Sequence, residues 1–362
     1  MLALAGAAAS AGGQPLWAQW QRQTSGTLAS LRGLSVVNDR VAWASGTEGT
    51  VLRTADGGAT WRVVRVRGAD SLDFRDVEAF DDRRAYVLSI GKGGASRIYK
   101  TVDGGDTWTM QFTNPDTAAF YDCIGFWNAE RGLAVSDPVR AHFPVIGTSD
   151  GGASWRALAS ARLPAAIPGE GAFAASGTCL VVGLPGDVWI ASGGGSRARV
   201  YRSRDHGRSW HVAATPIRSG APPRGIFSLA FAGRRHGVAV GGDYQSPGDT
   251  TANVALTDDG GATWRLPAGR PGGYRSSVAY VPGTGGRTFV AVGTSGSDYS
   301  VDGGETWVAI DTTGFNAVAL ARGPGGVAGW AVGSRGRVAK WTGALPVAEP
   351  PTGPVRVHKE PQ

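Results

Sequence analysis

The sequence has no long apolar run and no long stretch of helical periodicity. None of its apolar segments approaches the ~18 residues that a membrane-spanning helix requires. The formal net charge is +7, yet the Lys and Arg residues are scattered and no block of five or more occurs. Scattered charges are typical of a solvated surface, so we expect no nucleic acid partner and no transmembrane segment.

The common catalytic and cofactor motifs are also missing. No G-x-G-x-x-G pattern opens a helix after a strand, which argues against a nicotinamide or flavin enzyme. Gly147–Gly151 (GTSDG) formally matches the G-x-S-x-G elbow, but that elbow needs a strand-to-helix turn, and this match lies inside a repeated turn described below. The five histidines have no metal-ligand spacing. We therefore assign no metal and no cofactor.

Cysteine is scarce. Cys123 and Cys179 could pair after export, or could remain two buried free thiols, because so sparse a pair specifies neither state. Residues 1–13 are rich in Ala and Gly and resemble the back half of a secretory signal, although they lack its positive first part. We expect residues 1–13 to be a signal-peptide remnant and the protein to be exported, to the periplasm or outside the cell.

Glycine and tryptophan, in contrast, are abundant, with 57 and 13 residues, and many of them belong to one eight-residue pattern. The pattern first appears as Thr54–Trp61 (TADGGATW) and returns five times, at intervals of 43 to 55 residues. Its third position is always Asp, its fifth Gly, its seventh Ser or Thr, and its eighth Trp. A period of this size indicates a repeat architecture. The later copies are Thr101–Trp108, Thr148–Trp155, Ser203–Trp210, Thr257–Trp264 and Ser300–Trp307.

Each copy is typical of a β-hairpin turn, and we call these six segments the repeat turns. Paired glycines allow backbone conformations that a side chain would penalise, and the Asp can accept hydrogen bonds within its own turn. The Trp can bury its ring under the hairpin. We interpret these residues as structural rather than as calcium or acid/base sites. They are Asp56, Trp61, Asp103, Trp108, Asp150, Trp155, Asp205, Trp210, Asp259, Trp264, Asp302 and Trp307.

Four short apolar segments per repeat predict an all-β fold, a seven-bladed β-propeller with four antiparallel strands per blade. Among them we expect Ala172–Val182 as the first strand of blade 4 and Thr263–Leu266 as the last strand of blade 5. Leu16–Gln23 would pair with Arg337–Trp341, so that the N-terminal strand closes the last blade and no edge stays open. The propeller would span residues 14–342, followed by a disordered Pro-rich tail at 343–362, and we expect a monomer.

One face of this propeller should carry the function. The loops between blades and those between the second and third strands share a face, here called the loop face, and vary widely in length. The repeat turns share the opposite turn face. We predict a binding site on the loop face made of Asp122, Asp137, Glu170, Arg197, Arg224, Asp243, Tyr244, Tyr274 and Arg275. A further acid, Asp187, should lie on the turn face.

The repeat turns resemble the Asp-box, or BNR repeat, of sialidase-like and sortilin-like propellers. Over Trp20–Trp341 the chain also resembles the photosystem II stability/assembly-factor family and its bacterial homologues, through D-G-G-x-T-W boxes and through segments such as Gly237–Gly241 (GVAVG). The resemblance implies a seven-bladed propeller that binds an assembling membrane subunit through an arginine-bearing face. This chain departs from that pattern in the acids beside its arginines. The F/Y-R-I-P motif of sialidases is absent.

Two functions follow as expectations. The first is an exported, non-enzymatic scaffold that binds a protein or glycan through its loop face. The second is a glycoside hydrolase or lyase that uses two carboxylates roughly 5–10 Å apart at the channel mouth. Its catalytic candidates are Glu170, Asp243, Asp137 and Asp122.

Overall fold

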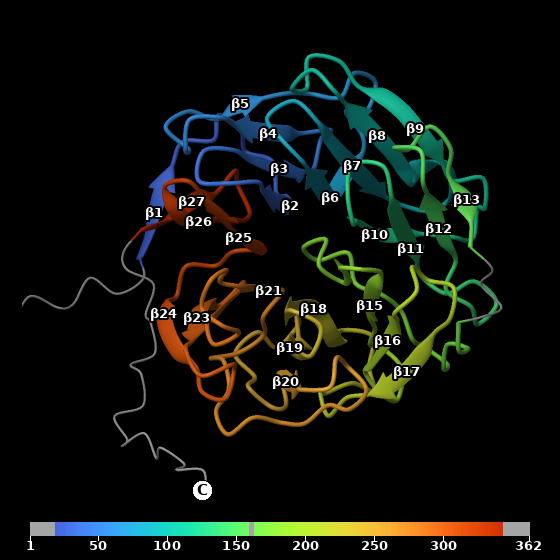
Figure 1. The fold of residues 1–362 in the computed structure, drawn as a ribbon, viewed down its shortest axis with the longest axis vertical. Helices are drawn as coiled ribbons and strands as arrows, with labels where there is room; N and C mark the ends of the chain where they lie inside the picture. Colours follow the sequence, from blue (N-terminus) through green and yellow to red (C-terminus); the bar gives the residue numbers. More distant parts are fainter. Residues whose placement is uncertain (1–18, 159–162, 343–362) are drawn as a thin grey trace, which may run out of the picture.

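A computed structural model describes residues 19–158 and 163–342, and these residues form a seven-bladed β-propeller. Seven antiparallel sheets stand around a central channel (Figure 1). The first strands of neighbouring blades contact one another around the channel, and the later strands of each blade follow outward. The predicted fold class is therefore confirmed. The segments predicted as a signal remnant (1–13) and a disordered tail (343–362) lie outside the described residues.

The last blade is closed by both ends of the described chain. The N-terminal strand β1 (Gln19–Gln23) pairs in antiparallel fashion with β27 (Val338–Thr342), and Trp20 lies opposite Trp341 (Figure 1). Their rings meet edge to face, with centroids 5.0 Å apart. The predicted closure is confirmed, because β1 covers the edge that β27 would otherwise expose.

Short apolar segments form the strands of the first three blades, which contain the only helical element of the described chain, the 3-10 turn η1. Their bounds are β2 (Leu31–Val36), β3 (Ala42–Gly46), β4 (Val51–Thr54), β5 (Arg62–Val63), β6 (Asp73–Ala79), β7 (Ala85–Ile90), η1 (Gly93–Ala95), β8 (Arg97–Thr101), β9 (Thr109–Thr113), β10 (Tyr121–Phe126), β11 (Gly132–Ser136), β12 (Val145–Thr148) and β13 (Arg156–Ala157).

Blades 4 to 7 continue the pattern, except that blade 5 has three strands. Thr263–Leu266, predicted as its fourth strand, is reduced to a single bridge between Leu256 and Arg265. The chain turns away after this bridge through Pro267, which has no N–H to donate to a ladder. The strands are β14 (Leu180–Gly183), β15 (Asp187–Ala191), β16 (Arg199–Ser203), β17 (His211–Ala214), β18 (Arg224–Ala232), β19 (His236–Asp243), β20 (Val254–Thr257), β21 (Ser277–Tyr280), β22 (Phe289–Gly293), β23 (Gly296–Ser300), β24 (Val308–Asp311), β25 (Ala317–Gly323) and β26 (Gly326–Val332).

The six repeat turns share one hydrogen-bond pattern. In the first turn, Thr54 Oγ1 and the Thr60 backbone N–H both donate to Asp56 Oδ1, at 2.8 and 2.9 Å, and Thr60 Oγ1 donates to Asp56 Oδ2 at 2.6 Å. The side-chain hydrogen bond from Thr60 is the main reason that the pKa of Asp56 falls to about 2. The Gly58 N–H closes the turn on Thr54 Oγ1. The Asp side chain is thus fully engaged in holding its own turn.

The Trp residues of these turns pack between blades. Trp61 joins a buried cluster with residues of blade 7, and its Nε1 donates to Gln23 Oε1 at 2.9 Å. Trp108 meets Trp43 of the preceding blade edge to face, with centroids 6.4 Å apart. In the first two blades, a large apolar side chain thereby fastens the blade to its neighbour, which stabilises the ring.

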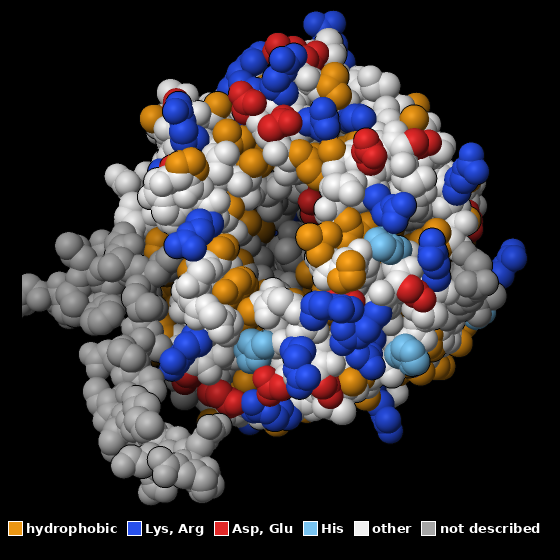
Figure 2. Space-filling view, viewed as in Figure 1, with side chains coloured by type: hydrophobic (Ala, Val, Ile, Leu, Met, Phe, Trp, Pro, Cys, Tyr) orange, Lys and Arg blue, Asp and Glu red, His pale blue; other side chains and the backbone are white. Residues whose placement is uncertain are grey.

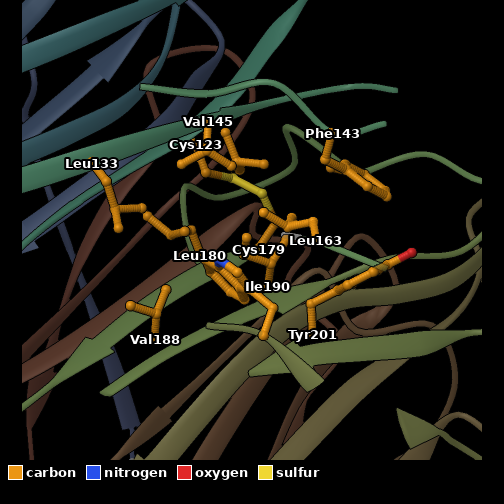
Figure 3. Close-up of a cluster of buried hydrophobic side chains, with 13 residues drawn as sticks. Cys123, Leu133, Phe143, Val145, Leu163, Cys179, Leu180, Val188, Ile190 and Tyr201 are labelled. Atoms are coloured by element: carbon orange, nitrogen blue, oxygen red, sulfur yellow. A yellow bond between two sulfur atoms is a disulfide. The ribbon is translucent and has the colours of Figure 1, made fainter. Parts of the chain in front are cut away.

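A disulfide joins blades 3 and 4. Cys123 of β10 and Cys179, just before β14, are both fully buried and form a bond across 56 positions of sequence. Figure 3 shows the bond among apolar side chains that include Leu133, Phe143 and Val145. Of the two states that the sequence left open, the structure therefore shows the paired one.

The first strand of blade 4 begins later than Ala172–Val182, so that prediction was wrong over residues 172–179. The backbone of this stretch, Ala172–Thr178, crosses the channel instead and is named the channel segment; it belongs to the green chain near the centre of the ring in Figure 1. Gly177 has a φ of +78°, which a strand does not accommodate. Ser176 Oγ donates to the Ser276 carbonyl of blade 6 at 2.9 Å, and Thr178 Oγ1 lies 2.6 Å from Ser228 Oγ of blade 5.

Candidate functional site: the recess at the channel mouth

Four β-bulges shape the loop-face mouth of the channel. At the start of β2, β6, β10 and β18 the pairing register slips by one residue, at Arg32, Arg75, Asp122 and Phe227 respectively. A bulge leaves the extra residue unpaired and re-aims its side chain. One position of the repeat therefore supplies two guanidinium groups, a carboxyl group and an aromatic ring near the axis of the ring.

Three of these side chains, Arg32, Arg75 and Phe227, line a recess of about 290 Å³, which we call the mouth recess, whereas Asp122 does not line it. The channel segment supplies one wall, and the starts of four inner strands and two loops supply the others. Figure 2 looks onto the opposite, turn face and shows that the ring is hollowed at its centre there as well. The lining residues are Arg32, Arg75, Phe173, Ala174, Ala175, Phe227, Tyr244, Tyr274, Ser276, Thr294 and Asn316.

Arg32 is the least satisfied charge in the recess. Its guanidinium makes one long contact, from Nη1 to the Ala175 carbonyl at 3.5 Å. Within residues 19–158 and 163–342, no carboxylate forms an ion pair with it. Burial lowers its pKa, and the neighbouring Arg75 lowers it further. Arg75, in contrast, has a partner, because its Nε donates to Asp73 Oδ2 at 2.7 Å.

Aromatic rings form the other side of the recess. Phe173 of the channel segment stacks on Phe227, with centroids 4.0 Å apart. Tyr274 meets Phe227 edge to face at 4.8 Å, and Tyr244 approaches it at 6.1 Å with 47% of its surface exposed. A cationic pocket with aromatic walls suits an anionic group attached to an apolar one.

Of the nine residues predicted to bind, Tyr244 and Tyr274 line this recess. Two more form an ion pair at its edge, where Arg224 Nε donates to Asp243 Oδ2 at 2.8 Å. Asp243 Oδ1 also accepts the Gln245 N–H at 2.9 Å, so this acid is occupied. Arg275 points elsewhere, since it is buried against Asp298 and donates from Nε at 2.5 Å.

Asp122 and Asp137 lie together in blade 3, under the channel segment. Asp137 Oδ1 accepts the Ala172 N–H at 2.9 Å. Burial raises the pKa of Asp137 to about 6. Burial, and then the charge of Asp137, raises the pKa of Asp122 well above its usual range. Asp122 is 2% exposed, and its Oδ2 has no hydrogen-bond partner among the described residues. Both acids therefore face backbone of the channel segment.

Glu170 is enclosed in a separate cluster. Arg199 forms a two-pronged ion pair with it, Ser192 Oγ donates to its Oε1 at 2.5 Å, and Tyr201 lies 3.1 Å from its Oε2. The cluster holds the end of the loop that precedes the channel segment. Arg197 is exposed in the loop between β15 and β16 and does not line the mouth recess. Asp187 lies at the turn-face end of β15, as expected, and pairs with Arg234 at 2.7 Å.

Beneath the channel segment the channel continues as an inner chamber of about 360 Å³, lined largely by Leu, Val and Ala. Two acids of β6, Asp76 and Glu78, border it. Burial raises the pKa of Asp76 to about 7, and burial together with the charge of Asp76 raises that of Glu78. Asp76 Oδ2 accepts the Ile124 N–H at 2.7 Å, which ties blade 2 to blade 3.

Arg32, Arg75, Phe173 and Phe227 were not predicted. Sequence reasoning placed function in the long loops, whereas three of these residues are the bulged positions of regular strands. Aligning the starts of the first strands against one another would have revealed the signal, because LRGL, FRDV, YDCI and IFSL each place the projecting residue second.

Neither a metal cluster nor a membrane-spanning helix is found in the described parts of the chain. No group of three or more His, Cys, Asp or Glu there is placed to hold a metal ion. None of the helical structure described has the length and apolar character needed to cross a membrane.

Comparisons with known proteins give the fold. No family model matches the sequence, and no curated protein matches it. Among solved structures, the chain is similar to YCF48 bound to a D1 peptide (TM-score 0.63, 16% identity, 90% of this chain and 97% of that chain). It is also similar to YCF48 from Cyanidioschyzon merolae (TM-score 0.60, 17% identity, 89% of this chain and 98% of that chain). A third similar structure is the WD40 β-propeller domain of Doa1 (TM-score 0.57, 12% identity, 90% of this chain and 97% of that chain). At these identities, what the chain shares with all three is the β-propeller.

Proposed function

We propose that this protein is a binding scaffold without catalytic activity, and that it receives a segment of a partner protein in the mouth recess. The observation that carries the proposal is Arg32, a half-buried guanidinium that faces a recess with aromatic walls and has no ionic partner. A buried charge without a partner is costly. A carboxylate of the partner would supply the missing ion pair.

The side chains of the recess also indicate which residue should neighbour the acid in the partner's segment. Phe173, Phe227 and Tyr274 offer apolar surface beside Arg32, so an apolar side chain adjacent to the acid fits best. The volume of about 290 Å³ holds one or two side chains rather than a folded domain. The similar YCF48 structure contains a bound peptide, which supports a protein segment over a glycan as the ligand.

Selection from a displayed random-peptide library tests the proposal. Enriched peptides are titrated against the wild-type chain, Arg32→Gln and Arg197→Gln, where Arg197 is an exposed arginine of the same face that lies outside the recess. We expect Arg32→Gln to weaken binding by about tenfold or more, equivalent to roughly 1.4 kcal/mol, and Arg197→Gln to change it less than twofold. The peptides should share an acidic residue next to an apolar one.

Two results would contradict the proposal. One is an equal loss of peptide affinity in Arg32→Gln and Arg197→Gln, and the other is a set of enriched peptides without an acidic residue. Unfolding cannot explain the weaker peptide binding expected of Arg32→Gln. Removing an unpaired, half-buried charge should leave the melting temperature unchanged or higher. A parallel screen for glycan hydrolysis, with Glu170→Ala and Asp243→Ala as controls, examines the enzymatic alternative. We expect no activity, because both acids are engaged by arginines.

We further propose that the chain is an exported member of the photosystem II assembly-factor-like propellers and that its repeat turns are Asp-boxes. The Cys123–Cys179 disulfide supports export, because such bonds persist in oxidising compartments. The shared hydrogen-bond pattern of the turns and the similarity to two YCF48 structures support the family. Fractionation of cells that carry the tagged full-length gene tests the location.

A further inference from the structure

The fourth repeat turn lacks one glycine that the other five share. Gly57, Gly104, Gly151, Gly260 and Gly303 follow the Asp of their turns, with φ between +67° and +82°. The fourth turn has His206 there, with a φ of +60°. A non-glycine residue in this left-handed conformation costs about 1 kcal/mol or more. The chain keeps a strained histidine where glycine would serve the turn.

His206 faces a groove of about 450 Å³ between blades 3 and 4, on the turn face. We call it the turn-face groove. Its ring lies against Trp127, with centroids 4.8 Å apart. Trp127 is fixed in turn, because its Nε1 donates to the Gly183 and Asp187 carbonyls at 3.1 and 3.2 Å. Leu133 and Leu158 add apolar surface. One end of the groove therefore carries two aromatic rings in contact, those of Trp127 and His206.

The charge of the groove is positive. Arg131, Arg156 and Arg208 line it, and Asp150 is the only acid among the lining residues. The Asp150 carboxylate is occupied by its own turn, with hydrogen bonds from Thr148 Oγ1 and Ser154. Burial, and then the charges of Arg131 and Arg208, lower the pKa of His206. Arg131, Arg208 and His206 line the same groove, so all three can face one ligand.

We infer that the turn-face groove binds a phosphate or sulfate ester carried by a small ring compound, such as a sugar or a nucleoside. Guanidinium groups bind tetrahedral oxyanions through paired N–H donors. Trp127 and His206 offer flat surfaces against which the ring of the ligand can pack. The groove is on the face opposite the mouth recess, so this inference is independent of the proposed function.

Titration calorimetry at a fixed ionic strength tests it, with inorganic phosphate, glucose 6-phosphate, adenosine monophosphate and uncharged glucose as probes. We expect one of the two esters to bind at least tenfold more tightly than inorganic phosphate, and glucose not to bind. The ester that binds more tightly identifies the ring. No preference of either ester over inorganic phosphate would overturn the inference, because it would indicate an adventitious basic surface.

Three variants assign the binding to the groove. Arg156→Gln should lower the affinity for the ester at least fivefold. His206→Gly restores the residue found in the other five turns, so it should keep or raise the melting temperature while reducing the ester's affinity to that of inorganic phosphate. Arg287→Gln, an exposed arginine of the same face in blade 6, serves as the control and should change affinity less than twofold. Equal effects of Arg156→Gln and Arg287→Gln would overturn the assignment, and so would unchanged ester binding in His206→Gly.

Discussion

At the scale of single residues, Asp76 shows how this fold places acids in unfavourable surroundings. The carboxyl group borders an apolar chamber and is only 4% exposed. Burial raises its pKa from 3.8 to about 7, so the folded protein holds a proton that the unfolded chain has lost between about pH 4 and pH 7. The free energy of unfolding therefore falls as pH rises through this window.

Asp76→Asn should remove that dependence. The amide oxygen can still accept the Ile124 N–H, and no charge is buried at high pH. We expect a gain on the order of 2–4 kcal/mol at pH 8 and little change at pH 4. Denaturant titrations at both pH values provide the measurement. A variant as sensitive to pH as the wild type would show that Asp76 is ionised without cost in the folded protein.

Asp259 represents the opposite case, an acid whose surroundings are built to receive it. Its Oδ1 accepts the Thr257 hydroxyl and the Ala262 and Thr263 N–H groups at 2.8 to 2.9 Å, and its Oδ2 accepts the Thr263 hydroxyl at 2.7 Å. Asp259→Ala should cost about 1–2 kcal/mol, because these donors lose their acceptor. Thermal unfolding checks this, and Asp70→Ala, an exposed acid outside the turns, should leave the melting temperature unchanged.

At the scale of elements, the channel segment forms no strand and is held by contacts to other blades. Cys179 fixes its end to β10, and Asp122 and Asp137 lie under its backbone. Replacing Cys123 and Cys179 with Ala should lower the free energy of unfolding by about 3 kcal/mol, since the bond closes a long loop. Guanidinium denaturation measures the loss. A double variant as stable as the wild type would contradict a stabilising role for the bond.

The elements also show what sequence reasoning reaches. Repeated Asp, Gly and Trp residues determine local turns, so the blades, their order and the closure of the ring were predictable from pattern alone. The channel segment was not, because its hydrogen bonds go to Ser276, Ser228 and other groups far away in sequence. Its alternating apolar residues look like a strand until Gly177 is seen to turn the chain into the channel.

The side chains that line the mouth recess were harder to predict than the fold for a related reason. Charged residues in long loops were predicted to bind a ligand. In the structure, however, Glu170 forms an ion pair with Arg199, and Arg275 forms one with Asp298. Pairing of this sort depends on three-dimensional neighbours that no single sequence reveals. Arg32 occupies the same bulged position as Arg75 of the next blade, and it differs from Arg75 in that no carboxylate of the described residues pairs with it.

At the scale of the whole molecule, the stability of the closed propeller should depend on the pairing of β1 with β27. Trp20 packs on Trp341 and Phe315, and its Nε1 donates to Ser297 Oγ of blade 6 at 2.9 Å. Removing residues 1–23 would expose the β27 edge. We expect a lower, broader melting transition and self-association by light scattering. Removing residues 1–13 alone should leave both unchanged, and identical behaviour of the two truncations would refute the dependence on β1.

The pairing of β1 with β27 also sets an order of events during synthesis. The first described strand leaves the ribosome long before its partner exists, so the last blade cannot be completed until β27 has been made. Completion of the ring is then a single late step that converts a stack of blades into a closed body.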